Sequence, residues 1–106
     1  MAAEWLSGQG FTLISRNWRS SRYEVDIIAS REGILHFIEV KARHDDQFGF
    51  PEDWVNRKKG RHLLCAGEAY QHQYPQWILI QFDIISILFT TPGKGELFFI
   101  EDVYWW

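Results

Sequence analysis

The chain has 106 residues, of which 46% are hydrophobic and 17% aromatic, and its formal net charge is −3. This length and apolar content exclude a disordered chain and leave room for one hydrophobic core rather than two. The negative net charge excludes nucleic-acid binding through bulk positive charge alone. The single cysteine, Cys65, excludes an internal disulfide and is typical of a reducing compartment.

The start of the chain has no basic segment followed by an apolar run, and the longest apolar stretches are too short to cross a bilayer. We therefore expect a cytoplasmic protein without a signal peptide and without a membrane partner.

The first half of the chain predicts a short helix followed by three strands. Residues 2–6 suit the end of a helix, and Glu32-Gly33 supplies a hairpin turn between the second and third strands. Apolar residues on both faces of the third strand indicate a central strand that is covered on both sides. The predicted strands are Phe11–Ser15, for which an extension to Trp18 stays open, Tyr23–Ser30 and Ile34–Ala42.

The second half predicts a helix between the third strand and two further strands. Pro51 suits the first turn of this helix, which we expect to continue to about Gln73. Strands follow at Trp77–Phe89 and Glu96–Tyr104. The resulting order is α-β-β-β-α-β-β, which predicts an α/β fold with a mixed β-sheet flanked by helices. We expect residues 1–106 to form one domain.

Charged residues interrupt the second and third strands in a regular pattern. Glu24, Asp26, Glu39 and Lys41 are embedded among β-branched and aromatic residues. Because strand side chains alternate, Glu24 shares a face with Asp26, and Glu39 with Lys41. The hairpin turn makes the two strands neighbours, and in a suitable register Asp26 would lie across from Glu39. Charges are rarely buried unless they are paired or bind a metal, so this pattern indicates a functional site.

Hard oxygen ligands without a Cys/His cluster favour Mg²⁺ or Mn²⁺. Asp26, Glu39 and the backbone carbonyl of Val40 are the candidate ligands, and Lys41 would orient or deprotonate an attacking water or neutralise a phosphorane. The site therefore suits the cleavage of a phosphodiester. The alternative interpretation is a surface ion pair on an edge strand, between Glu39 and either Lys41 or Arg43.

The pattern continues along almost the whole chain and resembles a known family. The quoted motifs are Glu24-Val-Asp26-Ile-Ile-Ala, Phe37-Ile-Glu39-Val-Lys41-Ala-Arg43, Phe48-Gly49, Lys59 and Phe82-Asp83, with Asn17-Trp18-Arg19 near the start. They are similar to those of the bacterial YraN-like family (uncharacterised protein family 0102). Its members are regarded as predicted endonucleases of the PD-(D/E)xK restriction-endonuclease-like superfamily, similar to archaeal Holliday-junction resolvases.

The resemblance implies a restriction-endonuclease-like fold, a DNA substrate and Mg²⁺ or Mn²⁺ as the cofactor. By it, Asp26, Glu39 and Lys41 would be catalytic, and Glu24 an accessory metal ligand. The candidate DNA contacts are Arg19, Arg43 and Lys59. Relatives in the superfamily often dimerise, and a branched or structured DNA substrate follows only by analogy.

Three positions depart from the family pattern. The family usually opens with a longer helix, and related nucleases use a glutamate there as a further metal ligand; Glu4 does not match that place. We therefore expect a truncated first helix, which bears on activity rather than on fold. Tyr23 stands where the family usually has Gly, and Gln81 where Arg is common.

Two other functions stay open. The first is a non-catalytic nucleic-acid-binding module that retains the nuclease fold. The second is a small scaffold protein that dimerises through its aromatic end, Trp105-Trp106. The four histidines have no metal-ligand spacing, and we interpret Asp83, inside an apolar strand, as a structural residue that either pairs with a basic residue or ends a strand ladder.

Overall fold

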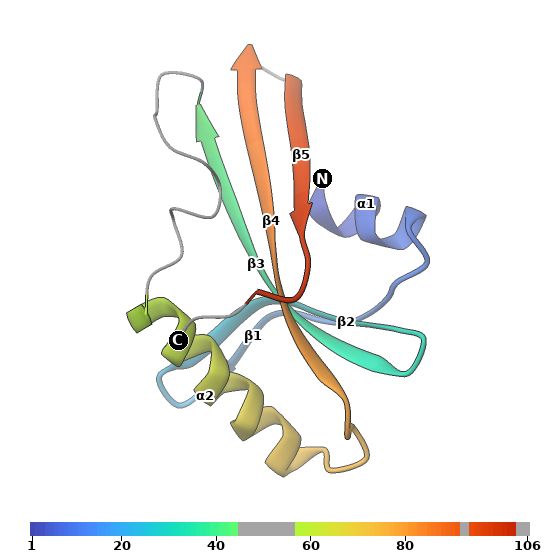
Figure 1. The fold of residues 1–106 in the computed structure, drawn as a ribbon, viewed down its shortest axis with the longest axis vertical. Coiled ribbons are helices and arrows are strands. Elements are labelled where there is room, and N and C mark those ends of the chain that lie inside the picture. Colours follow the sequence, from blue (N-terminus) through green and yellow to red (C-terminus); the bar gives the residue numbers. More distant parts are fainter. Residues whose placement is uncertain (45–56, 92–93, 104–106) are drawn as a thin grey trace.

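The computed structural model describes residues 1–44, 57–91 and 94–103, with side chains at all of these except 44, 57–59 and 91. In these residues, two helices and five strands follow one another in the predicted order, α-β-β-β-α-β-β (Figure 1). The elements are α1 (Ala2–Gly8), β1 (Thr12–Ser20), β2 (Tyr23–Arg31), β3 (Ile34–His44), α2 (Arg57–Gln73), β4 (Ile80–Thr91) and β5 (Lys94–Ile100). The α/β fold class and the element order expected for a restriction-endonuclease-like sheet are confirmed.

The five strands form one mixed sheet whose spatial order follows the chain, from β1 to β5. Three of the four strand pairs, β1–β2, β2–β3 and β4–β5, are antiparallel, whereas β3 and β4 are parallel. A parallel pair needs a crossover connection, and α2 lies within it. The strand β3 is therefore central, as its two apolar faces predict.

Each helix covers one face of the sheet, and each face has its own apolar core (Figure 1). On one face, Leu63 and Tyr70 of α2 pack with Phe37 and other buried strand residues. On the opposite face, Leu6 of α1 packs with Ile38 and its neighbours. Burial of these side chains stabilises the layers by roughly 1.5–3 kcal/mol for each large apolar residue.

The helix α2 lies unusually close to the sheet at Gly67. A Cβ built at this glycine would meet the ring of Phe82 at 2.9 Å. Gly67, which on helix propensity alone weakens the helix, therefore allows the close approach of α2 to β4. This contact fixes how the C-terminal half of α2 faces the strands.

The β2–β3 turn forms at Glu32 and Gly33, as predicted. Both residues have positive φ, 54° and 79° respectively. Two successive left-handed residues are typical of a type I′ hairpin turn, which matches the twist of paired strands.

Several predicted boundaries need correction. The strand β4 begins at Ile80 and not at Trp77, and Ile78 before it is 82% exposed. The strand β1 begins at Thr12 and continues to Ser20, beyond the end that the sequence predicts. The strand β5 ends at Ile100 rather than at Tyr104. The predicted start of the second helix at Pro51 lies outside the described residues.

Asp83 pairs with His36 in the core, which identifies the basic group expected beside it. The Nδ1 atom of His36 lies 2.6 Å from Oδ2 of Asp83, and both side chains are almost fully buried. The other carboxylate oxygen, Oδ1, accepts hydrogen bonds from the Gln81 amide and from the backbone N–H of Asp102, each at 2.9 Å. Asp83 is thus a structural anchor that holds the segment after β5 against β4.

None of the helices in the described part of the chain is long and apolar enough to cross a bilayer.

Candidate functional site

The site begins at an irregularity in β1 and β2. The β1–β2 register pairs Arg16 with Ile27 and Trp18 with Val25, which leaves Asn17 facing Asp26 between them. Asn17 has a positive φ of 52°, a left-handed conformation that Asn adopts more readily than most residues. The regular pairing of β2 with β3 also ends here, at Ile27 opposite Ile38. The regular pairing of β2 with β1 and with β3 is therefore interrupted at Asp26.

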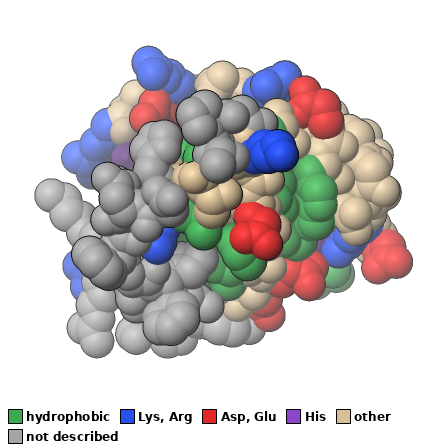
Figure 2. Space-filling model, turned by 90° about the horizontal axis from the view of Figure 1, so that it is seen from above, with side chains coloured by type: hydrophobic (Ala, Val, Ile, Leu, Met, Phe, Trp, Pro, Cys, Tyr) green, Lys and Arg blue, Asp and Glu red, His purple; other side chains and the backbone are tan. Residues whose placement is uncertain are grey.

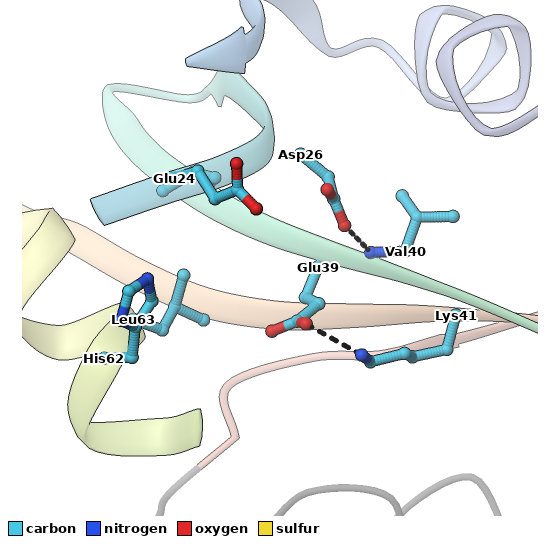
Figure 3. Close-up of a pocket in the computed structure, with 8 residues that line it drawn as sticks. Glu24, Asp26, Glu39, Val40, Lys41, His62 and Leu63 are labelled. Carbon is cyan, nitrogen blue, oxygen red and sulfur yellow. Dashed lines mark hydrogen bonds and ion pairs between the residues drawn. The ribbon is translucent and has the colours of Figure 1, made fainter. Parts of the chain in front are cut away.

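The side chain of Asp26 bridges the resulting gap to β3. Its Oδ2 accepts a hydrogen bond of 2.8 Å from the backbone N–H of Val40 (Figure 3). Because the N–H and C=O of one strand residue point to the same edge, the Val40 carbonyl also faces β2. The arrangement places the two predicted oxygen donors of Asp26 and Val40 on the same side of β3.

Burial raises the pKa of the Asp26 carboxyl above its usual value, because the charged form is poorly solvated there. The hydrogen bond from Val40 opposes this rise. The negative charge of Glu39 adds to it, the positive charge of Lys41 opposes it, and the charge of Glu24 adds a smaller rise. The two neighbouring carboxylates thus act electrostatically on Asp26.

Glu39 and Lys41 lie on the same face of β3, two residues apart. The Lys41 ammonium nitrogen is 3.0 Å from a Glu39 carboxylate oxygen, and each side chain is 25% exposed. The alternative interpretation predicted this ion pair on an edge strand. The strand β3 is central in the sheet, but at these two residues it pairs with β4 alone, since its pairing with β2 ends at Ile38. The ion pair lines a cavity at this point.

The cavity has a volume of about 410 Å³ and brings together residues of β2, β3 and α2. Figure 3 shows Glu24, Asp26 and Glu39 around it, with Lys41 at one end and α2 at the other. Its lining residues are Glu24, Val25, Asp26, Glu39, Val40, Lys41, His62 and Leu63. All four charged residues of the sequence pattern therefore share one cavity.

His62 was missed by sequence reasoning. Its spacing from the other histidines shows no metal-ligand pattern. Its ring lies against that of Tyr23, with centroids 5.2 Å apart. Tyr23 is one of the positions that depart from the family pattern, and here it supports the α2 wall of the cavity.

The predicted DNA contacts differ in how they are placed. Arg19 forms an ion pair of 3.0 Å with Glu24 across the β1–β2 ladder, and the two side chains are 77% and 60% exposed. Arg43 is half-buried on β3, beyond Lys41. Lys59 lies in α2, but its side chain is outside the described part. Exposed ion pairs contribute little stability, so Arg19 can exchange Glu24 for another anion at small cost.

Acidic and basic side chains are interspersed among the described residues of the face in Figure 2. This view agrees with the net charge of −3 and with the absence of bulk positive charge in the sequence. Any contact with DNA on this face would rely on individual side chains.

The donor set fits a hard divalent cation. Within the described residues, no three His, Cys, Asp or Glu side chains lie together closely enough to form a metal site by themselves. Mg²⁺, however, commonly uses only one or two carboxylates and completes its shell with water and phosphate oxygens. Asp26 and Glu39, with the carbonyl of Val40, supply that number of protein ligands. Glu24 is turned to Arg19 and would be an accessory ligand at most.

A family model described as "Uncharacterised protein family UPF0102" matches residues 1–87. The chain belongs to this family. The matched range includes every residue that lines the cavity. The resemblance noted from the motifs is therefore confirmed at the level of the family.

Curated UPF0102 relatives match nearly the full length of the chain. A UPF0102 protein of Chloroherpeton thalassium is 32% identical, over 98% of this chain and 87% of the relative. One from Clostridium perfringens strain SM101 is 35% identical over the same shares. One from Flavobacterium johnsoniae is 38% identical, over 95% of this chain and 82% of the relative.

Proposed function

We propose that this protein is a metal-dependent endonuclease that hydrolyses DNA phosphodiester bonds, with branched or otherwise structured DNA as the substrate class. The observation that carries the proposal is the convergence of Asp26, Glu39 and Lys41 on one cavity. Two carboxylates beside an ammonium group suit phosphodiester hydrolysis, since they combine cation ligands with a positive charge for the phosphoryl group.

The electrostatics of Asp26 support this function. Burial and the charges of Glu39 and Glu24 raise its pKa, so a bound cation would relieve an unfavourable concentration of negative charge. Groups that are perturbed in this way gather at functional sites more often than elsewhere.

Each residue has a distinct role in the proposal. Asp26, Glu39 and the Val40 carbonyl would hold Mg²⁺ or Mn²⁺, which when bound polarises the phosphoryl oxygen and acidifies a water. The hydrogen bond from Val40 orients Asp26, and Glu39 holds the Lys41 ammonium 3.0 Å from its carboxylate. Lys41 would contact the nonbridging phosphate oxygens and stabilise the added negative charge in the transition state.

The experiment is a cleavage panel of single-stranded, duplex, flapped and four-way DNA, with Mg²⁺ or Mn²⁺ and with chelator. Metal-dependent cutting by the wild-type protein that is lost in Lys41→Ala supports the nuclease. A matched control is Lys94→Ala, which removes the same charge from an exposed position on β5. Equal cutting by wild type and Lys41→Ala would point to a contaminating nuclease and contradict the proposal.

A second candidate is a non-catalytic nucleic-acid-binding module. It is favoured by the finding that the described residues contain no group of three metal-ligating side chains. The two candidates differ in the effect of Asp26→Asn. In a nuclease this change abolishes cleavage, whereas in a binding module it leaves the DNA affinity unchanged and there is no cleavage to lose.

A homodimer is part of the proposal as well. Ile78 and Leu79, which precede β4, are 82% and 61% exposed, and apolar side chains of this size are commonly covered at subunit contacts. Light scattering during size-exclusion chromatography measures the mass directly. A monomer at all concentrations used for cleavage would contradict this part alone.

A further inference from the structure

His62 is the imidazole among the described residues that line the cavity. It stands beside Leu63, whose side chain is buried against the sheet, so the backbone of α2 is fixed at this point. The His62 side chain is half-buried, and its ring lies at 59° to that of Tyr23. The imidazole is thus held at the cavity wall by packing on both elements.

Lys41 and His62 flank the carboxylates from opposite sides. In Figure 3, Lys41 lies at one end, the carboxylates of Asp26 and Glu39 lie between, and His62 lies on α2 at the other end. Phosphoryl transfer requires the attacking and leaving oxygens to be roughly in line across phosphorus. A phosphate bound at the carboxylates with its attacking water on the Lys41 side would direct its leaving oxygen toward α2.

The leaving oxygen of a phosphodiester develops negative charge as its bond to phosphorus breaks. A proton donor beside that oxygen accelerates the reaction, and histidine is the side chain most suited to this at neutral pH. Lys41, which pairs with Glu39, lies on the other side of the cavity. His62 lies on the α2 side, toward which the leaving oxygen would point in this arrangement.

We propose that His62 is the general acid that protonates the leaving oxygen. This inference rests on the proposed nuclease function and adds a catalytic residue to it.

Atoms and charge are conserved in this step. The oxygen of a water forms a bond to phosphorus, retains one hydrogen and releases the other to solvent. The bond between phosphorus and the bridging oxygen breaks, and its electron pair stays on that oxygen. The imidazolium of His62 gives its proton to this oxygen, which leaves as a hydroxyl. Neutral His62 then regains a proton from solvent.

The charged groups that share the cavity with His62 come from two strands. Glu24 and Asp26 line it from β2, and Glu39 and Lys41 line it from β3. Tyr23 contacts the ring, and the Arg22 guanidinium lies 5.5 Å from the Tyr23 ring centroid. Three carboxylates thus share the cavity with one lysine and the imidazole.

The test uses two DNA substrates of identical sequence after the product ends of wild-type cleavage have been determined. One is the ordinary phosphodiester, and the other carries sulfur in place of the leaving bridging oxygen. A thiolate leaves without protonation, so it does not need a general acid. We expect His62→Gln to lower the single-turnover rate on the oxygen substrate by roughly 100-fold or more, and by less than about fivefold on the sulfur substrate.

The control is His72→Gln, at an exposed position in the last turn of the same helix, which should cleave both substrates like the wild type. An equal loss on both substrates would show that His62 has only a structural or binding role and would overturn the inference. Wild-type rates in His62→Gln on the oxygen substrate would overturn it as well. Absence of cleavage by the wild-type protein would overturn the nuclease proposal, and this inference with it.

Discussion

Asp26 accepts a hydrogen bond from the backbone N–H of Val40 at 2.8 Å, at the point where the β2–β3 ladder has ended. A carboxylate therefore satisfies a backbone donor that a regular strand would have paired. Asp26 therefore has a structural role as the acceptor for Val40 and a proposed chemical role as a metal ligand. Different substitutions at Asp26 can separate the two roles.

Asp26→Asn should stabilise the protein at neutral pH. The pKa of Asp26 is raised in the folded state, so the charged carboxylate costs folding free energy above both the folded and the unfolded pKa. The cost disappears as the pH falls through the folded value and then the unfolded one. Asn retains an oxygen acceptor for Val40, and we expect a gain of roughly 0.5 kcal/mol, or about 2–4 °C in Tm.

Thermal melts of wild type and Asp26→Asn between pH 3 and 8 measure this difference. The gain should be largest at neutral pH and should shrink toward acid pH. A variant that is less stable than wild type at pH 7 would contradict the stated cause of the pKa rise.

Asp26→Ala should destabilise the protein, in contrast to Asp26→Asn. It removes the acceptor and leaves the partly buried N–H of Val40 without its partner, which costs about 1–2 kcal/mol. Urea denaturation of the two variants side by side gives the comparison. Equal stability of the two would mean that the hydrogen bond to Val40 contributes nothing.

Lys41→Ala should abolish cleavage with only a small change in stability. The Lys41–Glu39 pair retains partial contact with solvent, so we expect less than about 1 kcal/mol on folding and at least a hundredfold loss in cleavage rate. Binding of a labelled substrate should persist. Loss of cleavage together with unfolding would attribute the effect to the fold rather than to the chemistry.

Arg19→Ala should weaken DNA binding without affecting stability. Its exposed ion pair with Glu24 contributes little, and its removal should reduce the slope of log affinity against log salt by about 1 if it contacts a phosphate. Glu24→Gln is the matched variant, since it releases Arg19 from its partner and should strengthen binding. Unchanged salt slopes in both variants would exclude Arg19 from the DNA contacts.

Asp83→Ala should be among the most destabilising single changes in the core. It would leave the His36 ring nitrogen, the Gln81 amide and the Asp102 backbone N–H without their common acceptor, at a cost of roughly 3 kcal/mol or more. Ser86→Ala is the matched control on the same strand. The Ser86 hydroxyl is buried and has no hydrogen-bond partner among the described residues, so its removal should be neutral or stabilising.

The hairpin of β2 and β3 could be predicted from the sequence because its determinants are local. The turn residues Glu32 and Gly33 set the register, whose last pair, Ile27 with Ile38, lies directly beside Asp26 and Glu39. The ends of β4 and β5 could not be predicted in the same way. Trp77 to Leu79 are apolar enough for a strand, but they connect α2 to β4, which begins at Ile80.

The cavity wall formed by α2 could not be predicted because it depends on how the helix is rotated against the sheet. The close approach at Gly67 and the burial of Leu63 decide that rotation, and both are contacts between residues far apart in the chain. His62 has no local pattern that marks it. The His36–Asp83 pair likewise depends on the parallel register of β3 and β4, which the sequence does not specify.

The parallel pairing of β3 and β4 also implies an order of folding. The strands β1, β2 and β3 are chain neighbours joined by short turns, whereas β4 joins β3 only after the crossover through α2. Contacts close in sequence form sooner than distant ones, so in pulse-labelled hydrogen exchange we expect the Val40 amide, which donates to Asp26, to gain protection before the Leu35 amide, which donates to the Leu79 carbonyl after the crossover. Simultaneous protection would contradict this order. In a chain that is still being synthesised, the carboxylates of β2 and β3 would then come together first. The α2 wall of the cavity, with His62, would form only when β4 pairs with β3.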